Sequence, residues 1–218
     1  REDWIEAIKT IVDENRIRLQ EPMSRHTTFR IGGMAEIFLM PTIKEAVDVI
    51  TLCRAKKIPY TIIGNGSNLL VSDRGFRGVI IQLFKNFSDL RVEGDRLYVQ
   101  AGTLLSRTAK KALEASLTGF EFAAGIPGTI GGAVVMNAGA YGGEMRDIIE
   151  TVTVLDETGA QHVLSVEELE LGYRTSCILK KHYIVTQAVL KLAAGEEQAI
   201  RARMKELATQ RAECGKHI

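Results

Sequence analysis

The chain has 218 residues, of which 45% are hydrophobic and 25% charged, and its formal net charge at pH 7 is +1. This composition is typical of a soluble globular protein of one large or two small domains, and it excludes a general attraction to nucleic acid or to an anionic membrane. The longest apolar runs, such as residues 79–84, are far too short to span a bilayer.

The first half of the chain predicts alternating helices and strands. Apolar side chains recur at helical spacing over residues 2–15, which indicates an amphipathic helix. Strands are expected at 35–41, 60–63 and 79–83. Between the first two, Thr42 and Glu45 predict a capping box at the start of a helix. The residues that this helix is expected to bury are Ile43, Ala46, Val47, Ile50 and Cys53.

Hairpins dominate the second half. Residues 90–101 predict a hairpin that turns at Gly94-Asp95, and residues 151–165 predict another. Thr103 is expected to cap a helix whose buried face holds Leu105, Ala109, Ala112 and Leu113. Ser165 with Glu168 indicates a short capped helix, residues 182–192 a half-buried strand, and residues 196–212 an amphipathic helix. Strand–helix alternation combined with hairpins indicates an α+β fold.

Two glycine-rich stretches are candidate ligand sites. Eight of the twenty glycines lie within residues 119–143. A backbone that lies bare against a ligand would explain this density, and a series of tight turns is the alternative. The other stretch, GNGSNLLVSD at 64–73, follows a predicted strand but lacks the third glycine and the helix of a dinucleotide-binding fingerprint. Wrapping of a pyrophosphate and a plain turn both stay open for this loop.

Four motifs occur in order along the chain: HTTFRIGG (26–33), GNGSNLLVSD (64–73), GIPGTIGGAVVMNAGAYGGE (125–144) and GYRTS (172–176). Together they resemble the UDP-N-acetylenolpyruvoylglucosamine reductases, flavoenzymes of bacterial cell-wall synthesis, in the variety without an extra segment after Tyr-Arg. The resemblance implies a two-subdomain FAD-binding fold of the vanillyl-alcohol oxidase type, with subdomains at 1–80 and 81–218. It also implies tightly but non-covalently bound FAD, NADPH as co-substrate and a UDP-sugar substrate.

The same resemblance assigns the site residues. Arg174 is expected to be catalytic and to bind the enolpyruvyl group, with Tyr173 beside it, because a guanidinium stays cationic and grips a carboxylate through paired hydrogen bonds. A surface ion-pair partner is the alternative for Arg174. The expected cofactor-binding residues are Gly64, Asn65, Gly66, Ser67 and Asn68; Gly125, Ile126, Pro127, Gly128, Thr129, Gly131, Gly132, Asn137, Ala138 and Gly139; and Ile184 and Val185, on a strand bordering the adenosine half.

Other candidate residues receive structural interpretations. Some relatives of this fold attach FAD through histidine, but His26 is interpreted here as a hydrogen-bonded structural residue before a turn. Cys177 is interpreted as a buried small side chain. Three widely spaced cysteines argue against a disulfide framework and favour a reducing cytoplasm, and the four scattered histidines argue against a protein-built metal site.

The leading hypothesis is therefore NADPH-linked reduction of UDP-N-acetylglucosamine enolpyruvate to UDP-N-acetylmuramate. The protonating serine and the later glutamate of the family's third, substrate-binding domain have no counterpart in these residues, so the chain is expected to be an incomplete form with poor turnover. Two alternatives stay open: a flavin-binding module without catalysis, and an alcohol or sugar oxidase of the same fold. GYRTS argues against the oxidase, which needs no enol-carboxylate anchor. The oligomeric state is not determined by the sequence.

Overall fold

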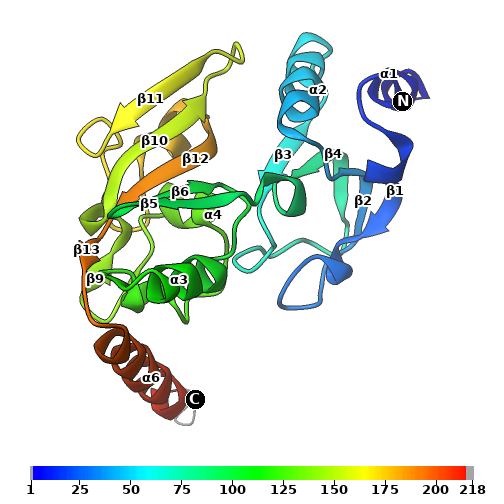
Figure 1. Ribbon diagram of the computed structural model, residues 1–218. Coiled ribbons are helices and arrows are strands. Elements are labelled where there is room, and N and C mark those ends of the chain that lie inside the picture. Colours follow the sequence, from blue (N-terminus) through cyan, green and yellow to red (C-terminus); the bar gives the residue numbers. More distant parts are fainter. Residues whose placement is uncertain (1, 215–218) are drawn as a thin grey trace. The chain divides into compact units, whose positions relative to one another are not determined.

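The computed structural model describes residues 2–214, which form two compact units (Figure 1). Unit 1 extends to Phe87 and includes Glu157–Gly159, and unit 2 contains the other residues from Ser88 onward. Residue 80 lies inside strand β4 (Phe76–Gln82), so the boundary between the units falls later in the chain than expected. The expected subdomain ranges 1–80 and 81–218 include residues 1 and 215–218, which lie outside the described residues.

Unit 1 is built on a four-stranded sheet with the order β1-β2-β4-β3. Strand β1 (Ile17–Pro22) is antiparallel to β2 (Met34–Leu39), whereas β4 is parallel to both β2 and β3 (Tyr60–Ile63). Helix α2 (Ile43–Ala55) connects β2 to β3, as a crossover between parallel strands requires. Short 3-10 turns at Glu14–Arg16, Met23–Arg25 and Lys85–Phe87 complete the unit.

The predicted capping box of α2 is confirmed. The Thr42 hydroxyl accepts from the Glu45 N–H at 3.4 Å, and a Glu45 carboxylate oxygen accepts from the Thr42 N–H at 2.7 Å. The same carboxylate accepts from the Arg16 guanidinium, with 3.0 Å to Nε. Burial alone would raise the pKa of Glu45, but the hydrogen bonds from Arg16, Thr42 and Asp13 outweigh it and lower the pKa to about 2.

Three predictions for unit 1 need correction. Helix α1 (Glu2–Lys9) ends well before residue 15, because the chain turns after Lys9 while still burying Ile8 and Val12. Strand β1 was not predicted, since most of its residues are exposed or half-buried and show no apolar alternation. In α2, Ile43 is exposed and Val47 is half-buried, whereas Val49 belongs to the buried face with Ala46, Ile50 and Cys53.

Unit 2 is built on a five-stranded antiparallel sheet with the order β11-β10-β12-β6-β5. Both predicted hairpins are confirmed. They are β5 (Leu90–Glu93) with β6 (Arg96–Gln100) and β10 (Ile149–Leu155) with β11 (Gln161–Ser165). The predicted strand at 182–192 is β12 (Ile184–Lys191), which lies between β10 and β6.

Helices α3 (Leu105–Glu114) and α4 (Ile130–Val135) share one apolar core with this sheet, and α4 packs against β6 and β12. Two short ribbons join β7 (Leu117–Thr118) to β13 (Ala193–Ala194) and β8 (Gly139–Ala140) to β9 (Gly143–Glu144). The remaining helical segments are the 3-10 turns η4 (Glu121–Ala123) and η5 (Met145–Asp147) and the helices α5 (Cys177–Lys181) and α6 (Glu197–Cys214).

Two capping predictions in unit 2 were wrong in part. Leu104, rather than Thr103, occupies the N-cap of α3, and Thr103 is fully buried with its carbonyl accepting from Ile130 N–H. Ser165 and Glu168 do form the reciprocal hydrogen bonds of a capping box, at 2.8 and 3.3 Å, but the following residues make turns and no helix.

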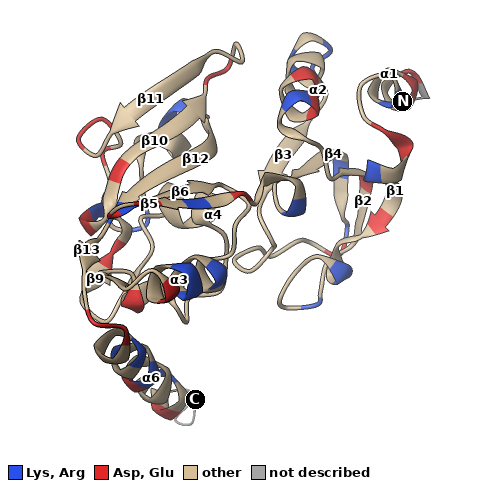
Figure 2. Ribbon diagram, viewed as in Figure 1, with Lys and Arg blue, Asp and Glu red and all other residues tan. Residues whose placement is uncertain are grey.

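Helix α6 agrees with the amphipathic helix expected at 196–212. It buries Ile200 and Leu207 and continues to Cys214. Acidic and basic residues are interspersed along it, as Figure 2 shows, and some form pairs such as Arg201 with Glu197 at 2.7 Å. Within residues 2–214, none of the helices combines the length and the hydropathy that a membrane span requires.

Candidate functional site

The first predicted cofactor segment, residues 64–68, is the loop that leaves the carboxyl end of β3. Gly66 adopts a left-handed backbone conformation with φ +73°, and a Cβ there would lie 1.8 Å from the His26 carbonyl oxygen. The Thr28 N–H donates to the Gly66 carbonyl at 3.2 Å. Only glycine allows this approach. Because the loop follows the carboxyl end of β3, it lies at the edge where open α/β sheets bind their ligands. Its contacts with His26 and Thr28 place it next to the HTTFRIGG segment.

The HTTFRIGG segment is attached to the same loop farther along. The Gly33 N–H donates to the Ser72 carbonyl at 2.9 Å, and a Cβ on Gly33 would lie 2.2 Å from the Asp73 carbonyl oxygen. His26 begins the segment. Its Nε2 lies 2.8 Å from a Glu21 carboxylate oxygen, and its ring stacks on Phe38 with centroids 4.1 Å apart. The structural interpretation of His26 is thus confirmed.

The second predicted cofactor segment begins around α4 in unit 2. Thr129 is the N-cap, and its hydroxyl accepts from the Gly132 N–H. The N–H groups of Ile130 and Gly131 donate to the carbonyls of Thr103 and Ala101, at 2.9 and 2.8 Å. These three N–H groups are paired inside the protein, so the idea of a wholly bare backbone does not apply to this part of the segment.

Several glycines of this stretch are required by packing of the protein on itself. A Cβ on Gly131 would lie 3.0 Å from that of Ala101, and a Cβ on Gly143 would lie 2.9 Å from the Phe122 ring. Gly142 has φ +81° at the tip of the β8–β9 ribbon, and a Cβ there would have nothing within 4 Å. Close internal packing and turns therefore explain part of the glycine density.

Asn137 ends α4 in a Schellman motif. Its φ is +45°, its N–H donates to the Val134 carbonyl at 3.2 Å, and the Ala138 N–H donates to the Ala133 carbonyl at 2.8 Å. Glycine is usual at this left-handed position, and asparagine is the common substitute. The backbone of the predicted segment at Asn137 and Ala138 is thus used to terminate the helix.

The side chain of Asn137 makes three hydrogen bonds and is 6% exposed. Its Nδ2 donates to a Glu144 carboxylate oxygen at 3.0 Å and to the Gly172 carbonyl at 3.3 Å. Its Oδ1 accepts from the Arg146 N–H at 3.0 Å. The amide therefore joins the end of α4, the turn after β9 and the GYRTS segment.

GYRTS forms a tight turn with the two predicted substrate residues at its tip. Gly172 and Thr175 exchange backbone hydrogen bonds at 3.1 and 3.4 Å. Tyr173 is 90% exposed, and Arg174 is exposed with φ +52° and its guanidinium 5.9 Å from the centre of the Tyr173 ring. Within residues 2–214 the Arg174 guanidinium has no carboxylate partner, in contrast to the ion pair considered as its alternative.

The stem of this turn is buried. Ser176 is fully buried and its hydroxyl donates to the Val135 carbonyl, in the last turn of α4, at 2.7 Å. Cys177 is buried as well, and burial raises the pKa of its thiol, which confirms its interpretation as a packed small side chain. The structure thus brings the Tyr173–Arg174 turn and the Asn137 end of the glycine-rich segment together.

The remaining predicted residues lie elsewhere. Ile184 and Val185 are buried on β12, where they pair with Leu155 and Val154 of β10. Residues 64–68 belong to unit 1, whereas all other predicted site residues belong to unit 2. No group of His, Cys, Asp or Glu side chains in the described part of the chain is arranged to hold a metal ion.

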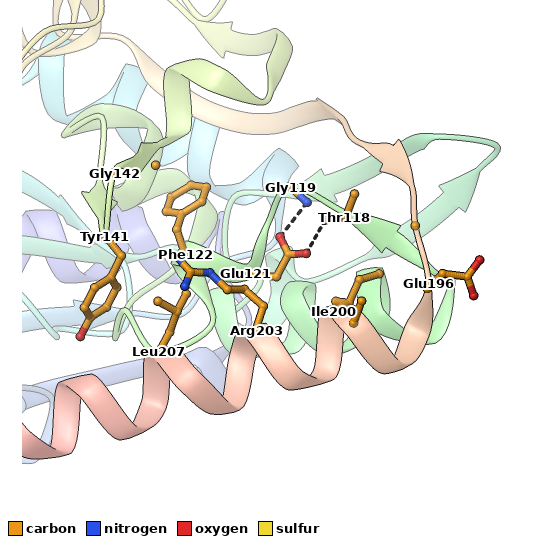
Figure 3. Close-up of a pocket in the computed structure, with 13 residues that line it drawn as sticks. Thr118, Gly119, Glu121, Phe122, Tyr141, Gly142, Glu196, Ile200, Arg203 and Leu207 are labelled. Atoms are coloured by element: carbon orange, nitrogen blue, oxygen red, sulfur yellow. Dashed lines mark hydrogen bonds between the residues drawn. The ribbon is translucent and has the colours of Figure 1, made fainter.

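The sequence did not predict a pocket of about 530 Å³ that α6 forms with the β8–β9 ribbon and η4 (Figure 3). Phe122, Tyr141, Ile200 and Leu207 supply apolar lining, and none of the predicted cofactor or substrate residues lines it. The Glu121 carboxylate accepts hydrogen bonds from the Thr118 hydroxyl and the Gly119 N–H, as the dashed lines show. Six of its lining residues, between Gly119 and Gly143, belong to the glycine-rich stretch, and most of the others come from α6, which the sequence did not place beside that stretch.

Comparison with known proteins defines the class first. A family model described as an FAD binding domain matches residues 35–165, more than half of the chain. Alkyldihydroxyacetonephosphate synthase superposes with a TM-score of 0.65 at 16% identity, over 89% of this chain and 44% of that chain. A solvent-stable cholesterol oxidase superposes with a TM-score of 0.62 at 14% identity, over 81% and 38%. The chain has the two-part, α+β FAD-binding fold of the vanillyl-alcohol oxidase type, as predicted.

Closer relatives define the family. UDP-N-acetylenolpyruvoylglucosamine reductases from Alkaliphilus metalliredigens and Clostridium botulinum strain Hall are 46% and 48% identical, over 97% of this chain and 70% and 69% of their own lengths. The crystal structure of the reductase from Thermus caldophilus has a TM-score of 0.77 at 39% identity, over 90% of this chain and 70% of that one. The chain belongs to the UDP-N-acetylenolpyruvoylglucosamine reductase family.

Proposed function

We propose that the protein carries out FAD-dependent, NADPH-linked reduction of UDP-N-acetylglucosamine enolpyruvate to UDP-N-acetylmuramate in peptidoglycan precursor synthesis. The observation that carries this proposal, beside family membership, is the exposed Tyr173–Arg174 turn on its buried stem, where the guanidinium has no carboxylate partner among residues 2–214. FAD, when bound, supplies hydride that it has received from NADPH. A cytoplasmic location belongs to the same proposal and is supported by the free thiols of all three cysteines.

Arg174 has the chemistry that this substrate needs. Addition of hydride to an enolpyruvyl double bond places negative charge on the neighbouring carbon and its carboxylate. A guanidinium is cationic at every physiological pH and can donate two parallel hydrogen bonds to a carboxylate. Its left-handed backbone at φ +52° is a strained conformation for a residue with a side chain, which is common where a functional group must be presented.

A structural observation supports the assignment of FAD to the 64–68 loop of unit 1. Gly66 cannot bear a side chain, and it brings the 64–68 loop against the His26–Thr28 backbone at the carboxyl end of β3. The short polar residues Asn65, Ser67 and Asn68 in this loop can hydrogen-bond to a diphosphate. We assign Gly64–Asn68 to the pyrophosphate of FAD.

In unit 2 we assign the predicted residues 125–129, 131–132 and 137–139, with Ile184 and Val185, to the remainder of FAD. The paired N–H groups of Gly131, Gly132, Asn137 and Ala138 restrict these four residues to contacts through other atoms. The donors of this segment are therefore to be sought at Gly125, Gly128 and Thr129, because the Ile126 N–H donates to the Ala123 carbonyl at 3.0 Å and Pro127 has no N–H.

The test begins with the visible spectrum of purified protein, which should show bound oxidised flavin. NADPH should bleach it in the absence of oxygen, and the enolpyruvyl substrate should restore the colour. Bleaching by an alcohol or sugar instead of NADPH would support the oxidase alternative. Absence of flavin after reconstitution with FAD would refute the proposal.

Arg174→Ala tests the role of the guanidinium, with Arg174→Lys as the matched variant that keeps the charge and loses the fork. Arg174→Ala should retain flavin and its bleaching by NADPH, and should slow reoxidation by substrate by about 100- to 1000-fold. The lysine variant should fall between this and the unchanged protein. Loss of flavin with an unchanged substrate step would show that Arg174 has another role.

We further propose that residues 1–218 are an incomplete form of the reductase, because the curated relatives extend beyond the matched region. Such a form binds FAD and reacts with NADPH, but it turns over the enolpyruvyl substrate poorly. This behaviour would also describe a flavin-binding module without catalysis, which is the second candidate. A steady-state rate equal to that of the full-length relatives would eliminate both the incomplete form and the flavin-binding module.

A further inference from the structure

The backbone conformation at Asn137 could be adopted by glycine without any side chain. The residue is the left-handed end of a Schellman motif, and glycine satisfies such a position at no steric cost. Asparagine is tolerated there, but tolerance does not explain a side chain that is 6% exposed and makes three hydrogen bonds. We therefore look for the role of asparagine in the hydrogen bonds of its side-chain amide.

The amide holds one edge of the Tyr173–Arg174 turn. Its Nδ2 donates to the Gly172 carbonyl at 3.3 Å, and Gly172 is the residue that closes the turn with Thr175. The other edge is held by the buried Ser176 hydroxyl on the Val135 carbonyl at 2.7 Å. Both anchors therefore come from the last residues of α4 and its C-terminal end, and the exposed tip of the turn lies between them.

We propose that Asn137 is a positioning residue, whose side-chain amide fixes the Gly172–Thr175 turn on the end of α4 and thereby sets where the Arg174 guanidinium is presented. The amide is oriented for this by its two further partners, the Glu144 carboxylate and the Arg146 N–H, both at 3.0 Å. The consequence for substrate binding rests on the proposed function of Arg174, whereas the anchoring of the turn does not.

Hydrogen exchange of the turn tests the anchoring without any cofactor or substrate. Asn137→Gly keeps the Schellman motif and removes the amide, and Asn137→Asp keeps an acceptor for the Arg146 N–H but cannot donate to Gly172. Thr108→Val is the matched control, because it removes another buried hydrogen bond of unit 2, from the Thr108 hydroxyl to the Leu104 carbonyl at 3.0 Å on α3.

The amides of Gly172 and Thr175 should exchange roughly 3- to 10-fold faster in both Asn137 variants, since one hydrogen bond to the turn is lost. The control should leave these two amides unchanged. Unchanged exchange at the turn in the two folded variants, or equal acceleration in the control, would overturn the proposal. Because glycine is the favoured residue at this backbone position, Asn137→Gly retains the fold, and Asn137→Asp provides an independent reading.

Binding of the enolpyruvyl substrate to the FAD-loaded protein tests the link to Arg174. Asn137→Gly should raise the Kd about fivefold, measured per bound FAD, and Arg174→Ala should raise it more. The double variant should bind no more weakly than Arg174→Ala alone, because Asn137 acts through the guanidinium. Additive losses would refute that link. If Arg174→Ala left the Kd unchanged while the turn still exchanged faster in Asn137→Gly, the proposed function of Arg174 would fail and the anchoring would stand.

Discussion

Substitution of Gly66 by alanine tests whether the loop of unit 1 depends on close backbone contact. The new Cβ would lie 1.8 Å from the His26 carbonyl oxygen and 2.9 Å from its carbon, where neither atom can rotate away. The loop must move by roughly an ångström or more to restore an ordinary contact distance, which breaks the bond from the Thr28 N–H to the Gly66 carbonyl. A left-handed alanine costs about 1–2 kcal/mol and the lost hydrogen bond about 1 kcal/mol, so unit 1 should lose roughly 2–3 kcal/mol of stability.

Gly94→Ala is the matched control for this substitution. Gly94 also has a left-handed backbone, with φ +60°, but nothing lies within 4 Å of its Cβ position. It should therefore lose only about 1–2 kcal/mol. Urea unfolding followed by circular dichroism compares the two variants, and the single tryptophan, Trp4 in α1, reports on unit 1. Gly66→Ala should also lose FAD, and Gly94→Ala should keep it. Equal destabilisation of the two variants, with FAD retained in both, would refute the reasoning.

Two further predictions concern ionisable groups. Since the pKa of Glu45 is lowered to about 2, its contribution of about 3 kcal/mol should be complete above about pH 5 and be lost as the pH falls toward 2. Acid unfolding of Glu45→Gln should lack this component, whereas Glu6→Gln, on the exposed face of α1, should retain it. Cys214 is exposed, whereas Cys53 and Cys177 are buried, and burial raises the pKa of Cys53 to about 11. A thiol reagent should therefore modify Cys214 rapidly in the native protein and the other two cysteines only on unfolding. Rapid modification of all three would contradict the packing described.

The elements that the sequence predicted well are those whose signal is local. The capping box at Thr42 and the hairpin across Gly94-Asp95 depend on residues a few positions apart, and both formed as expected. Strand β1 could not be predicted, because it is largely exposed and is defined by pairing with β2. Helix α1 ends at Lys9, although apolar residues at helical spacing continue to Val12. The turn after Lys9 still buries Val12, so the apolar spacing did not locate the end of the helix.

The candidate site shows the same limit in more detail. A dense run of glycines indicates that something approaches the backbone closely, but it does not say what. At Gly131 and Gly143 the approaching atoms belong to Ala101 and Phe122, so these glycines are required by the protein itself. The opposite pattern, a side chain where glycine would suffice, carries more information. Asn137 holds such a position, and its amide reaches a motif 35 residues away in sequence. The end of α4 and the GYRTS turn are thus joined by this amide as well as by the Ser176 hydroxyl, which is why we expect loss of the amide to affect Arg174.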